Sequence, residues 1–251
     1  MKYFKILALS LFLVPFLKIN TEIKIQKKHS ESTSLKKDST YSSVVDAFLN
    51  KMKKNYGKSF EKKIWNHHEE FRNNLINKEF DNFVFITSEK KKLDLKKYNT
   101  PIVIIATASW CAPCESLVPA INKLSKKYEK KVKFIMITHD IGEKAVDYSS
   151  KFNNTVSVIP SLKKKNSMKP VKLEIGEFKH ILAFPTIYFL NSEKKIVKIQ
   201  TGASRPKSYL VNGKINAESL FDDDLVIEKS RKESLNINFN LLKEGIEKSM
   251  K

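Results

Sequence analysis

The stretch that decides the fold is TASWCAPCESLVPA, residues 107–120, which contains both cysteines of this 251-residue chain. Two cysteines separated by two residues are compatible with half of a metal site, a redox-active pair or an incidental spacing. A continuous apolar run, residues 102–106, precedes the pair, and a helical pattern over 119–128 follows it. Such a run before a turn is typical of a strand buried on both faces. The cysteines are therefore expected at a strand-to-helix junction.

The expected position of Cys111 gives it a reactive sulfur. It would lie beside backbone N–H groups without helical partners, at the positive end of the helix dipole. Both favour the thiolate, the nucleophilic form of cysteine. Cys114 follows one helical turn later, within reach of a mixed disulfide formed at Cys111. Pro113 fits the first turn, where no intrahelical N–H donor is needed, and Trp110 can present a flat apolar surface to a bound peptide.

Metal binding is disfavoured by the number of available ligands. A structural zinc site needs about four, and the chain has no third cysteine. The histidines are His29, His67, His68, His139 and His180. His67 and His68 are adjacent, so on a helix they diverge by about 100°, and only His139 is expected near the cysteines, where a packing role is favoured. We predict no metal site, and copper delivery is disfavoured on the same grounds.

The periodicity after the cysteines predicts an α/β arrangement. Residues 132–139 form a second apolar strand, and a strand–helix–strand unit of this kind leads to parallel pairing with a right-handed crossover. A further helix is expected at 142–152 and a hairpin at 186–200. Residues 153–180 are left unassigned. Residues 206–233 are expected to add a strand or loop, with Asp222–Asp224 as a helix cap or solvated turn. The tail predicts an amphipathic helix with Ile237, Phe239, Leu242 and Ile246 on its apolar side.

The first 80 residues divide into three segments. Residues 1–20 have the basic start and apolar run of an export signal, too short for an ordinary spanning helix; a cleaved signal and a retained anchor both remain open. Residues 21–43 are rich in Lys, Ser and Thr and predict a flexible linker. Residues 44–80 predict two amphipathic helices joined at Gly57. Packing of these helices against the main domain, residues 81–251, is favoured over a separate partner-binding role.

The charge pattern argues against nucleic-acid binding. The formal net charge is +20, from 47 Lys and Arg against 27 Asp and Glu, and it is mostly lysine spread in short clusters. A nucleic-acid-binding surface more often shows arginine with interleaved aromatic residues. The basic surface is expected to be solvated, with adhesion to anionic lipid or an acidic partner as the alternative. The export signal indicates an extracytoplasmic location, periplasm or cell envelope, where a disulfide persists.

The sequences WCAPC (110–114) and FPT (184–186), with the apolar strand between them, together resemble the thioredoxin superfamily. The resemblance spans roughly residues 80–205. It implies a thioredoxin-like fold, a central mixed sheet flanked by helices. It also implies that Pro185 is cis and lies against the cysteine pair, with Phe184, Pro185 and Thr186 positioning an extended substrate. The lead-in KKLDLKKYNTPIVIIATASWCAPC is similar to the TlpA/ResA-like branch of exported thiol-disulfide oxidoreductases, which implies an extra hairpin before the first core strand and an insertion before the cis-proline.

Two positions depart from the pattern of the superfamily. Ile105 stands six residues before Cys111, where thioredoxin has a buried aspartate that accepts the proton of the second cysteine. Glu115 is an alternative acceptor, although a solvated first-turn acid is favoured for it. Phe184 replaces the small or β-branched residue of many members, which implies an altered substrate groove.

The resemblance implies a protein disulfide reductase of the envelope, with apocytochromes c among the substrates of that branch. Cys111 would attack and Cys114 resolve, with no cofactor beyond the redox-active Cys111–Cys114 disulfide. The expected partners are protein thiols or disulfides and a membrane electron donor; membrane association through the N-terminus and the direction of electron flow stay open. A non-catalytic binding module of the same fold is the alternative. A peroxidase is disfavoured, because Ile104 and Ala108 occupy the positions of its Pro and Thr.

Overall fold

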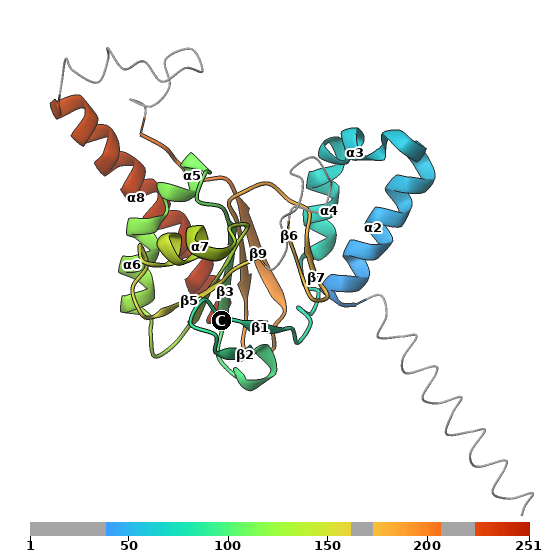
Figure 1. Cartoon of the computed structure of the whole chain (residues 1–251), viewed down its shortest axis with the longest axis horizontal. Helices are drawn as coiled ribbons and strands as arrows, with labels where there is room; N and C mark the ends of the chain where they lie inside the picture. The colour runs from blue at the N-terminus through green and yellow to red at the C-terminus, as the bar shows by residue number, and fades with distance from the viewer. Residues whose placement is uncertain (1–38, 162–172, 207–223) are drawn as a thin grey trace, which may run out of the picture.

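The structure is a computed structural model that describes residues 39–161, 173–206 and 224–251 (Figure 1). The predicted leader, most of the predicted linker, His29, Asp222 and Asp223 lie outside these ranges. No helix within the three described ranges combines the length and apolarity that a membrane crossing requires.

A five-stranded mixed sheet forms the centre of the molecule, in the order β5–β4–β3–β8–β9. Its strands are β3 (Ile102–Thr107), β4 (Lys133–Thr138), β5 (Val156–Ile159), β8 (Thr186–Leu190) and β9 (Ile196–Thr201). β3, β4 and β5 run parallel, whereas β8 pairs antiparallel with both β3 and β9. The predicted strand–helix–strand unit and the later hairpin are confirmed. β5 lies in the segment left unassigned, because four residues are too few for periodicity to separate strand from helix.

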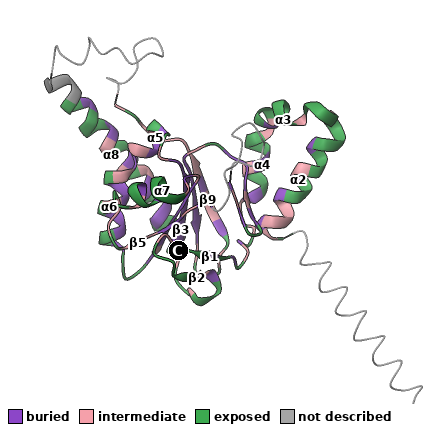
Figure 2. Ribbon diagram, in the orientation of Figure 1, coloured by how far each residue is buried: buried purple, intermediate pink, exposed green. Residues whose placement is uncertain are grey.

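The central strand β3 is buried on both faces, as its unbroken apolar run predicts (Figure 2). Successive side chains of a strand point to opposite faces of the sheet. Ile102, Ile104 and Ala106 accordingly join one hydrophobic cluster, and Val103 and Ile105 join another. The sheet therefore separates two cores, and each has its own cover.

Helices cover the Val103 face of the sheet. They are α6 (Val118–Lys127), α7 (Gly142–Ser149) and α8 (Asp224–Ser249). The first two match the predicted helices at 119–128 and 142–152. α8 also takes in residues 224–233, where a strand or loop was expected; no Gly or Pro interrupts the chain between 224 and 244, so nothing ends the helix there.

The predicted apolar side of α8 is partly wrong. Leu242 and Ile246 are buried in the cluster and Phe239 packs against it, but Ile237 is 49% exposed. Asn238 is fully buried instead. Adjacent helix positions diverge by about 100°, so turning Asn238 inward turns Ile237 out to solvent.

The N-terminal helices cover the opposite, Ile104 face (Figure 1). They are α2 (Tyr41–Tyr56), η1 (Gly57–Ser59), α3 (Phe60–Lys63), η2 (Ile64–His67) and α4 (His68–Leu75). The predicted break at Gly57 is confirmed, with φ of 49° there. The second predicted helix is interrupted by the 3₁₀ turn η2. We refer to residues 41–75 as the helical extension.

The helical extension starts before the predicted end of the linker at residue 43. Thr40 and Ser43 form a capping box, each side chain accepting a hydrogen bond from the other residue's backbone N–H. Tyr41 is fully buried and its hydroxyl donates to the carbonyl of Lys179 at 2.8 Å. The capping box and the burial of Tyr41 fix residues 40–43 in the helical extension, although their polar composition predicts a linker.

The helical extension and the sheet share one hydrophobic core. Val45, Phe48 and Leu75 belong to the same cluster as Ile104 and Tyr188. Two short hairpins complete the cover: β1 (Val84–Ile86) with β2 (Lys92–Asp94), followed by the turn η3 (Leu95–Lys97), and β6 (Leu173–Ile175) with β7 (Phe178–His180). The first is the predicted hairpin before the first core strand. The favoured interpretation, that the extension packs against the main domain, is confirmed.

Candidate active site

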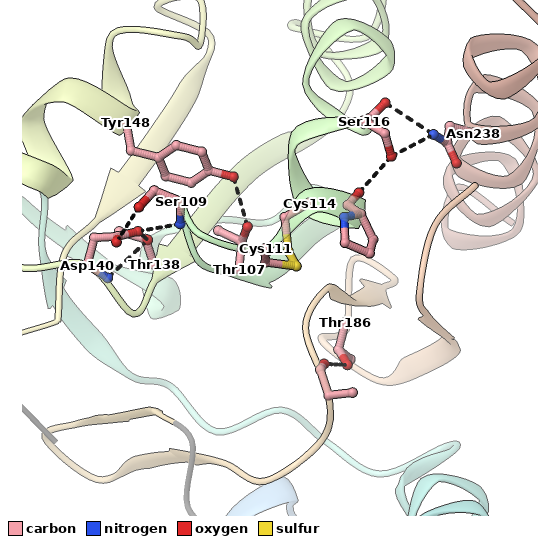
Figure 3. The surroundings of a disulfide bond; sticks show 12 residues. Thr107, Ser109, Cys111, Cys114, Ser116, Thr138, Asp140, Tyr148, Thr186 and Asn238 are labelled. Atoms are coloured by element: carbon pink, nitrogen blue, oxygen red, sulfur yellow. Dashed lines mark hydrogen bonds between the residues drawn. A yellow bond between two sulfur atoms is a disulfide. The ribbon is translucent and has the colours of Figure 1, made fainter. Parts of the chain in front are cut away.

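Cys111 and Cys114 form a disulfide at the junction of β3 and the short helix α5 (Ala112–Glu115) (Figure 3). Cys111 is the N-cap residue of α5, and its carbonyl accepts hydrogen bonds from the N–H groups of Cys114 (2.8 Å) and Glu115 (3.1 Å). Pro113 lies in the first turn of α5, where its missing N–H costs no helical bond. The predicted strand-to-helix junction is confirmed.

A groove of about 400 Å³ opens over Cys111. It is lined by Trp65, Trp110, Cys111, Ala112, Pro113, His139, Ala183, Phe184 and Arg205. Cys111 is 6% exposed and lines this groove, whereas Cys114, which is 2% exposed, does not. The sulfur that a substrate in this groove would meet is therefore that of Cys111.

The loop before β8 lies against the disulfide. The Phe184–Pro185 peptide bond is cis, as the resemblance implies. Phe184 packs against the small buried cluster of Ala108 and the two cysteines. Thr186 pairs with Ala106 across the sheet, and its hydroxyl donates to the carbonyl of Ala183 at 2.6 Å, which fixes the loop (Figure 3).

Aromatic rings surround the mouth of the groove. The ring centroid of Trp110 lies 5.9 Å from those of both His139 and Phe184, and the centroids of His139 and Phe184 are 6.1 Å apart. Trp110 is 63% exposed, so its indole presents a large apolar surface beside Cys111. His139 lies at the active edge, as predicted, in packing contact with these rings.

The other described histidines make packing or local polar contacts. Nε2 of His67 lies 2.8 Å from the hydroxyl of Tyr56, and Nδ1 of His180 lies 2.8 Å from the hydroxyl of Tyr188. His68 contacts the carbonyl of Trp65. Over the three described ranges, no three His, Cys, Asp or Glu side chains come together to hold a metal ion.

Asp140 is a residue of the site that the sequence analysis missed. Its carboxylate accepts hydrogen bonds from the N–H (2.7 Å) and the hydroxyl (2.6 Å) of Ser109, and from the hydroxyl of Thr138 (2.5 Å). It is only 6% exposed. Asp140 lies two residues after the end of β4, and the carboxyl ends of neighbouring parallel strands meet at one edge of a sheet. That position was a signal in the sequence that could have identified it.

A second polar pair lies behind the disulfide (Figure 3). The hydroxyl groups of Tyr148 and Thr107 are 2.9 Å apart and both residues are buried. Burial raises the pKa of Tyr148 above its ordinary value, and the charges of Glu115 and Asp140 act in the same direction, against the lowering effect of the Thr107 bond. Tyr148 therefore stays neutral and acts only as a hydrogen-bonding group.

Two positions near the cysteines, 105 and 115, are candidates for the group that accepts the proton of Cys114, and they differ in polarity. Ile105 is fully buried in an apolar cluster, so that position supplies no base. Oε2 of Glu115 accepts from Nζ of Lys151 at 2.7 Å, while Oε1 is buried and accepts no hydrogen bond from any described residue. The expectation of a solvated first-turn acid is thus wrong for one of its two oxygens, because α5 turns that oxygen towards protein.

The C-terminal helix is tied to the active-site helix through Asn238. Its amide Nδ2 donates to the carbonyls of Ser116 (3.1 Å) and Ser204 (3.0 Å), and its Oδ1 accepts from the N–H of Ser204 at 2.8 Å. The hydroxyl oxygen of Ser116 lies 2.8 Å from the carbonyl of Pro113 and 2.6 Å from that of Ser204, so its single proton can donate to either one. α8 thereby fixes the end of α5 against the segment that follows β9.

Comparison with known proteins agrees with this geometry. Residues 75–213 match the model of the Redoxin family. The chain belongs to the Redoxin family. This membership confirms the predicted superfamily, the thioredoxin-like fold and the thiol-disulfide oxidoreductase class.

Individual relatives match parts of this Redoxin protein. Thiol-disulfide oxidoreductase ResA of Bacillus thuringiensis subsp. konkukian is 27% identical over 129 residues, 49% of this chain and 68% of that protein. Thioredoxin C-2 of Corynebacterium nephridii is 35% identical over 51 residues, so the match spans 20% of this chain and only 47% of that relative. The crystal structure of StoA from Bacillus subtilis is 19% identical and covers 48% of this chain and 87% of that chain, with a TM-score of 0.37.

Proposed function

We propose that this protein is an exported protein disulfide reductase that acts on envelope proteins through the Cys111–Cys114 dithiol. One observation carries the proposal: Cys111 lines an open groove beside the cis-proline loop, while Cys114 lies beneath it. A disulfide reductase needs this asymmetry, with one sulfur accessible to the client and the other within reach of the first.

The proposed cycle begins with both cysteines reduced. The Cys111 thiolate attacks one sulfur of a client disulfide, which forms a mixed disulfide and releases the other client sulfur as a thiolate. Cys114, after loss of its proton, attacks the sulfur of Cys111, which releases the second client sulfur and forms the Cys111–Cys114 disulfide. Two electrons pass to the client. A membrane electron donor then restores the dithiol, and no other cofactor takes part.

The residues around the groove position the client. Trp110 and Phe184, whose rings contact each other edge to face, offer apolar surface in the groove that contains Cys111. Pro185 and Thr186 hold the loop whose backbone would pair with an extended segment, and Pro113 shapes the first turn of α5. The placement of Trp110, Pro113 and Phe184 in the groove with Cys111 supports their roles, and the resemblance supports those of Pro185 and Thr186.

The location and the clients are part of the proposal. The export-signal pattern at residues 1–20 supports an extracytoplasmic site of action, whether the leader is cleaved or retained as an anchor. Envelope proteins with exposed disulfides, apocytochromes c among them, are the proposed clients. The relative ResA, named a thiol-disulfide oxidoreductase, supports the reaction class.

The reduction potential of the Cys111–Cys114 pair, titrated against a dithiothreitol buffer, tests the proposal. A value near the roughly −270 mV of thioredoxin supports a reductant, whereas a value near roughly −120 mV would indicate a disulfide donor. Reduction of insulin by the wild type, lost in Cys111→Ser and arrested as a mixed disulfide in Cys114→Ser, is the second expected result. Two results together would support the binding module instead. The cysteines would fail to interconvert between dithiol and disulfide, and the Cys111→Ser variant would keep the cellular phenotype of the wild type.

A further inference from the structure

We infer that the helical extension forms part of the substrate site: Trp65 and Arg205 select client disulfides whose cysteine is flanked by an apolar side chain and an acidic residue. This inference rests on the proposed function and specifies its substrate class. It assigns a role to Trp65, which lies before the stretch matched by the Redoxin family, residues 75–213, and to Arg205, which lies within it.

The first observation is that one groove contains Trp65 and the accessible sulfur. Trp65 lies in η2, whereas Trp110, Cys111 and Phe184 lie on the two loops that carry the disulfide and the cis-proline. Trp65 is 40% exposed. A client segment that delivers its sulfur to Cys111 therefore enters a space bounded on one side by the helical extension.

The second observation is that the backbone of Trp65 is fixed relative to the sheet. Its neighbour Ile64 is 4% exposed and belongs to the core cluster shared with β3. On its other side, His67 lies 2.8 Å from the hydroxyl of Tyr56 and 3.3 Å from the carboxylate of Glu70. A rigidly held tryptophan loses little conformational entropy when it binds a ligand, which is why such residues dominate binding energies.

The character of the lining indicates the apolar part of the client. Trp65, Trp110 and Phe184 give the groove three large aromatic side chains, two of them among the most exposed apolar residues described. Exposed aromatic surface of this kind is typical of binding sites. An aromatic or large aliphatic side chain next to the client cysteine would cover it.

Arg205 indicates the charged part of the client. It is exposed, and no described carboxylate forms an ion pair with it. Arg205 also lines an adjoining hollow of about 600 Å³ between α5 and α8, together with Arg231, Lys232 and the carboxylates of Glu115 and Glu228. These two carboxylates form ion pairs with Lys151 and Lys232, respectively, and not with Arg205. Guanidinium groups remain charged at all physiological pH values and pair well with carboxylates. Charge complementarity therefore favours an acidic residue on the other side of the client cysteine.

The test compares two peptide disulfides of equal length. In the first, each cysteine is flanked by Phe and Glu; in the second, by Ala and Gln. We expect the wild type to reduce the first peptide with a kcat/KM about tenfold higher, because the aromatic contact and the exposed charge pair should each contribute about threefold. Trp65→Ala should lower this preference by about threefold, whereas Trp65→Phe should keep most of it.

The controls separate binding from folding and from chemistry. Val84→Ala removes a comparably exposed apolar side chain on β1, outside the groove, and should keep the preference. Arg205→Gln should also lower the preference by about threefold, because it removes the charge pair and leaves the aromatic contact. The reduction potential should be the same in all variants. Equal rates on both peptides, or the same loss on both peptides in Trp65→Ala, would overturn the inference and leave the reductase intact; failure of the wild type to reduce either peptide would overturn the proposed function itself.

Discussion

The carboxylate of Asp140 accepts hydrogen bonds from both the backbone N–H and the hydroxyl of Ser109, two residues before Cys111. Asp140 follows β4 and Ser109 follows β3, so this contact joins the ends of two parallel strands. It fixes the loop that carries Trp110 to the groove. The stability of the site thus depends on a residue that does not line the groove over Cys111.

Replacing Asp140 by Ala should destabilise the protein by about 2–3 kcal/mol, since it leaves the partly buried Ser109 donors without a charged acceptor. Urea denaturation of the oxidised protein measures this. Asp147→Ala is the matched control, because Asp147 is exposed on the neighbouring helix α7. Equal stability of the two variants would show that the Asp140 contact contributes nothing.

Asn238→Ala should lower the free energy of unfolding by about 1–3 kcal/mol, because the carbonyls of Ser116 and Ser204 lose buried donors. The end of α5 should also become less rigid, which hydrogen exchange of the amides after Cys114 would detect. Asn240→Ala, two residues along α8 and exposed, serves as the control. Unchanged exchange in α5 would contradict the proposed link between the two helices.

Gly245→Ala should destabilise the protein although alanine favours helix by about 1 kcal/mol over glycine. A Cβ at position 245 would collide with the ring of Phe189 on β8. Overpacking of this kind costs about 1–3 kcal/mol, so the steric effect outweighs the propensity. A double-mutant cycle with Phe189→Leu measures the coupling; the second substitution should relieve much of the loss, and additive effects would refute the collision.

Three buried tyrosines predict a loss of stability in alkaline solution. Burial raises the pKa of Tyr41, Tyr148 and Tyr188 above the ordinary value near 10. Below about pH 10 the tyrosines are protonated in both states. Above it the unfolded chain loses these protons while the folded chain keeps them. The free energy of unfolding should therefore fall as pH rises, by up to about 1.4 kcal/mol per pH unit for each tyrosine.

Guanidinium denaturation at pH 8 and at several values above 10 checks this slope. Tyr148→Phe should reduce the slope, because the phenylalanine has no proton to lose. Tyr98→Phe, at a partly exposed position, is the control. A slope that is the same in wild type and Tyr148→Phe would show that this tyrosine does not contribute.

The sequence predicts those features that depend on near neighbours. The apolar run of β3, the Cys111–Cys114 spacing and the break at Gly57 all follow from local periodicity or local backbone chemistry. The cis bond before Pro185 follows from the family resemblance rather than from the local pattern. These residues account for the centre of the sheet and for the disulfide itself.

The features that sequence analysis missed depend on contacts between distant segments. Tyr41 is ordered by Lys179, which is 138 residues away, and Trp65 reaches the groove only because its helices pack on the sheet. The inward side of α8 carries Asn238 rather than Ile237, because the buried hydrogen bonds between the Asn238 amide and Ser204 fix the rotation of the helix about its axis. No window of local sequence contains both partners of such contacts.

The core shared by the helical extension and the sheet has a consequence for how the protein can be divided. The family match begins at residue 75, yet the apolar residues that seal the Ile104 face begin at Tyr41. A fragment cut at the start of the match would present that face, with Ile104, Tyr188 and Leu190, to water. The stretch matched by the family is therefore shorter than the smallest fragment that can fold with its core covered. Any fragment meant to fold should include the helices from Tyr41 onwards.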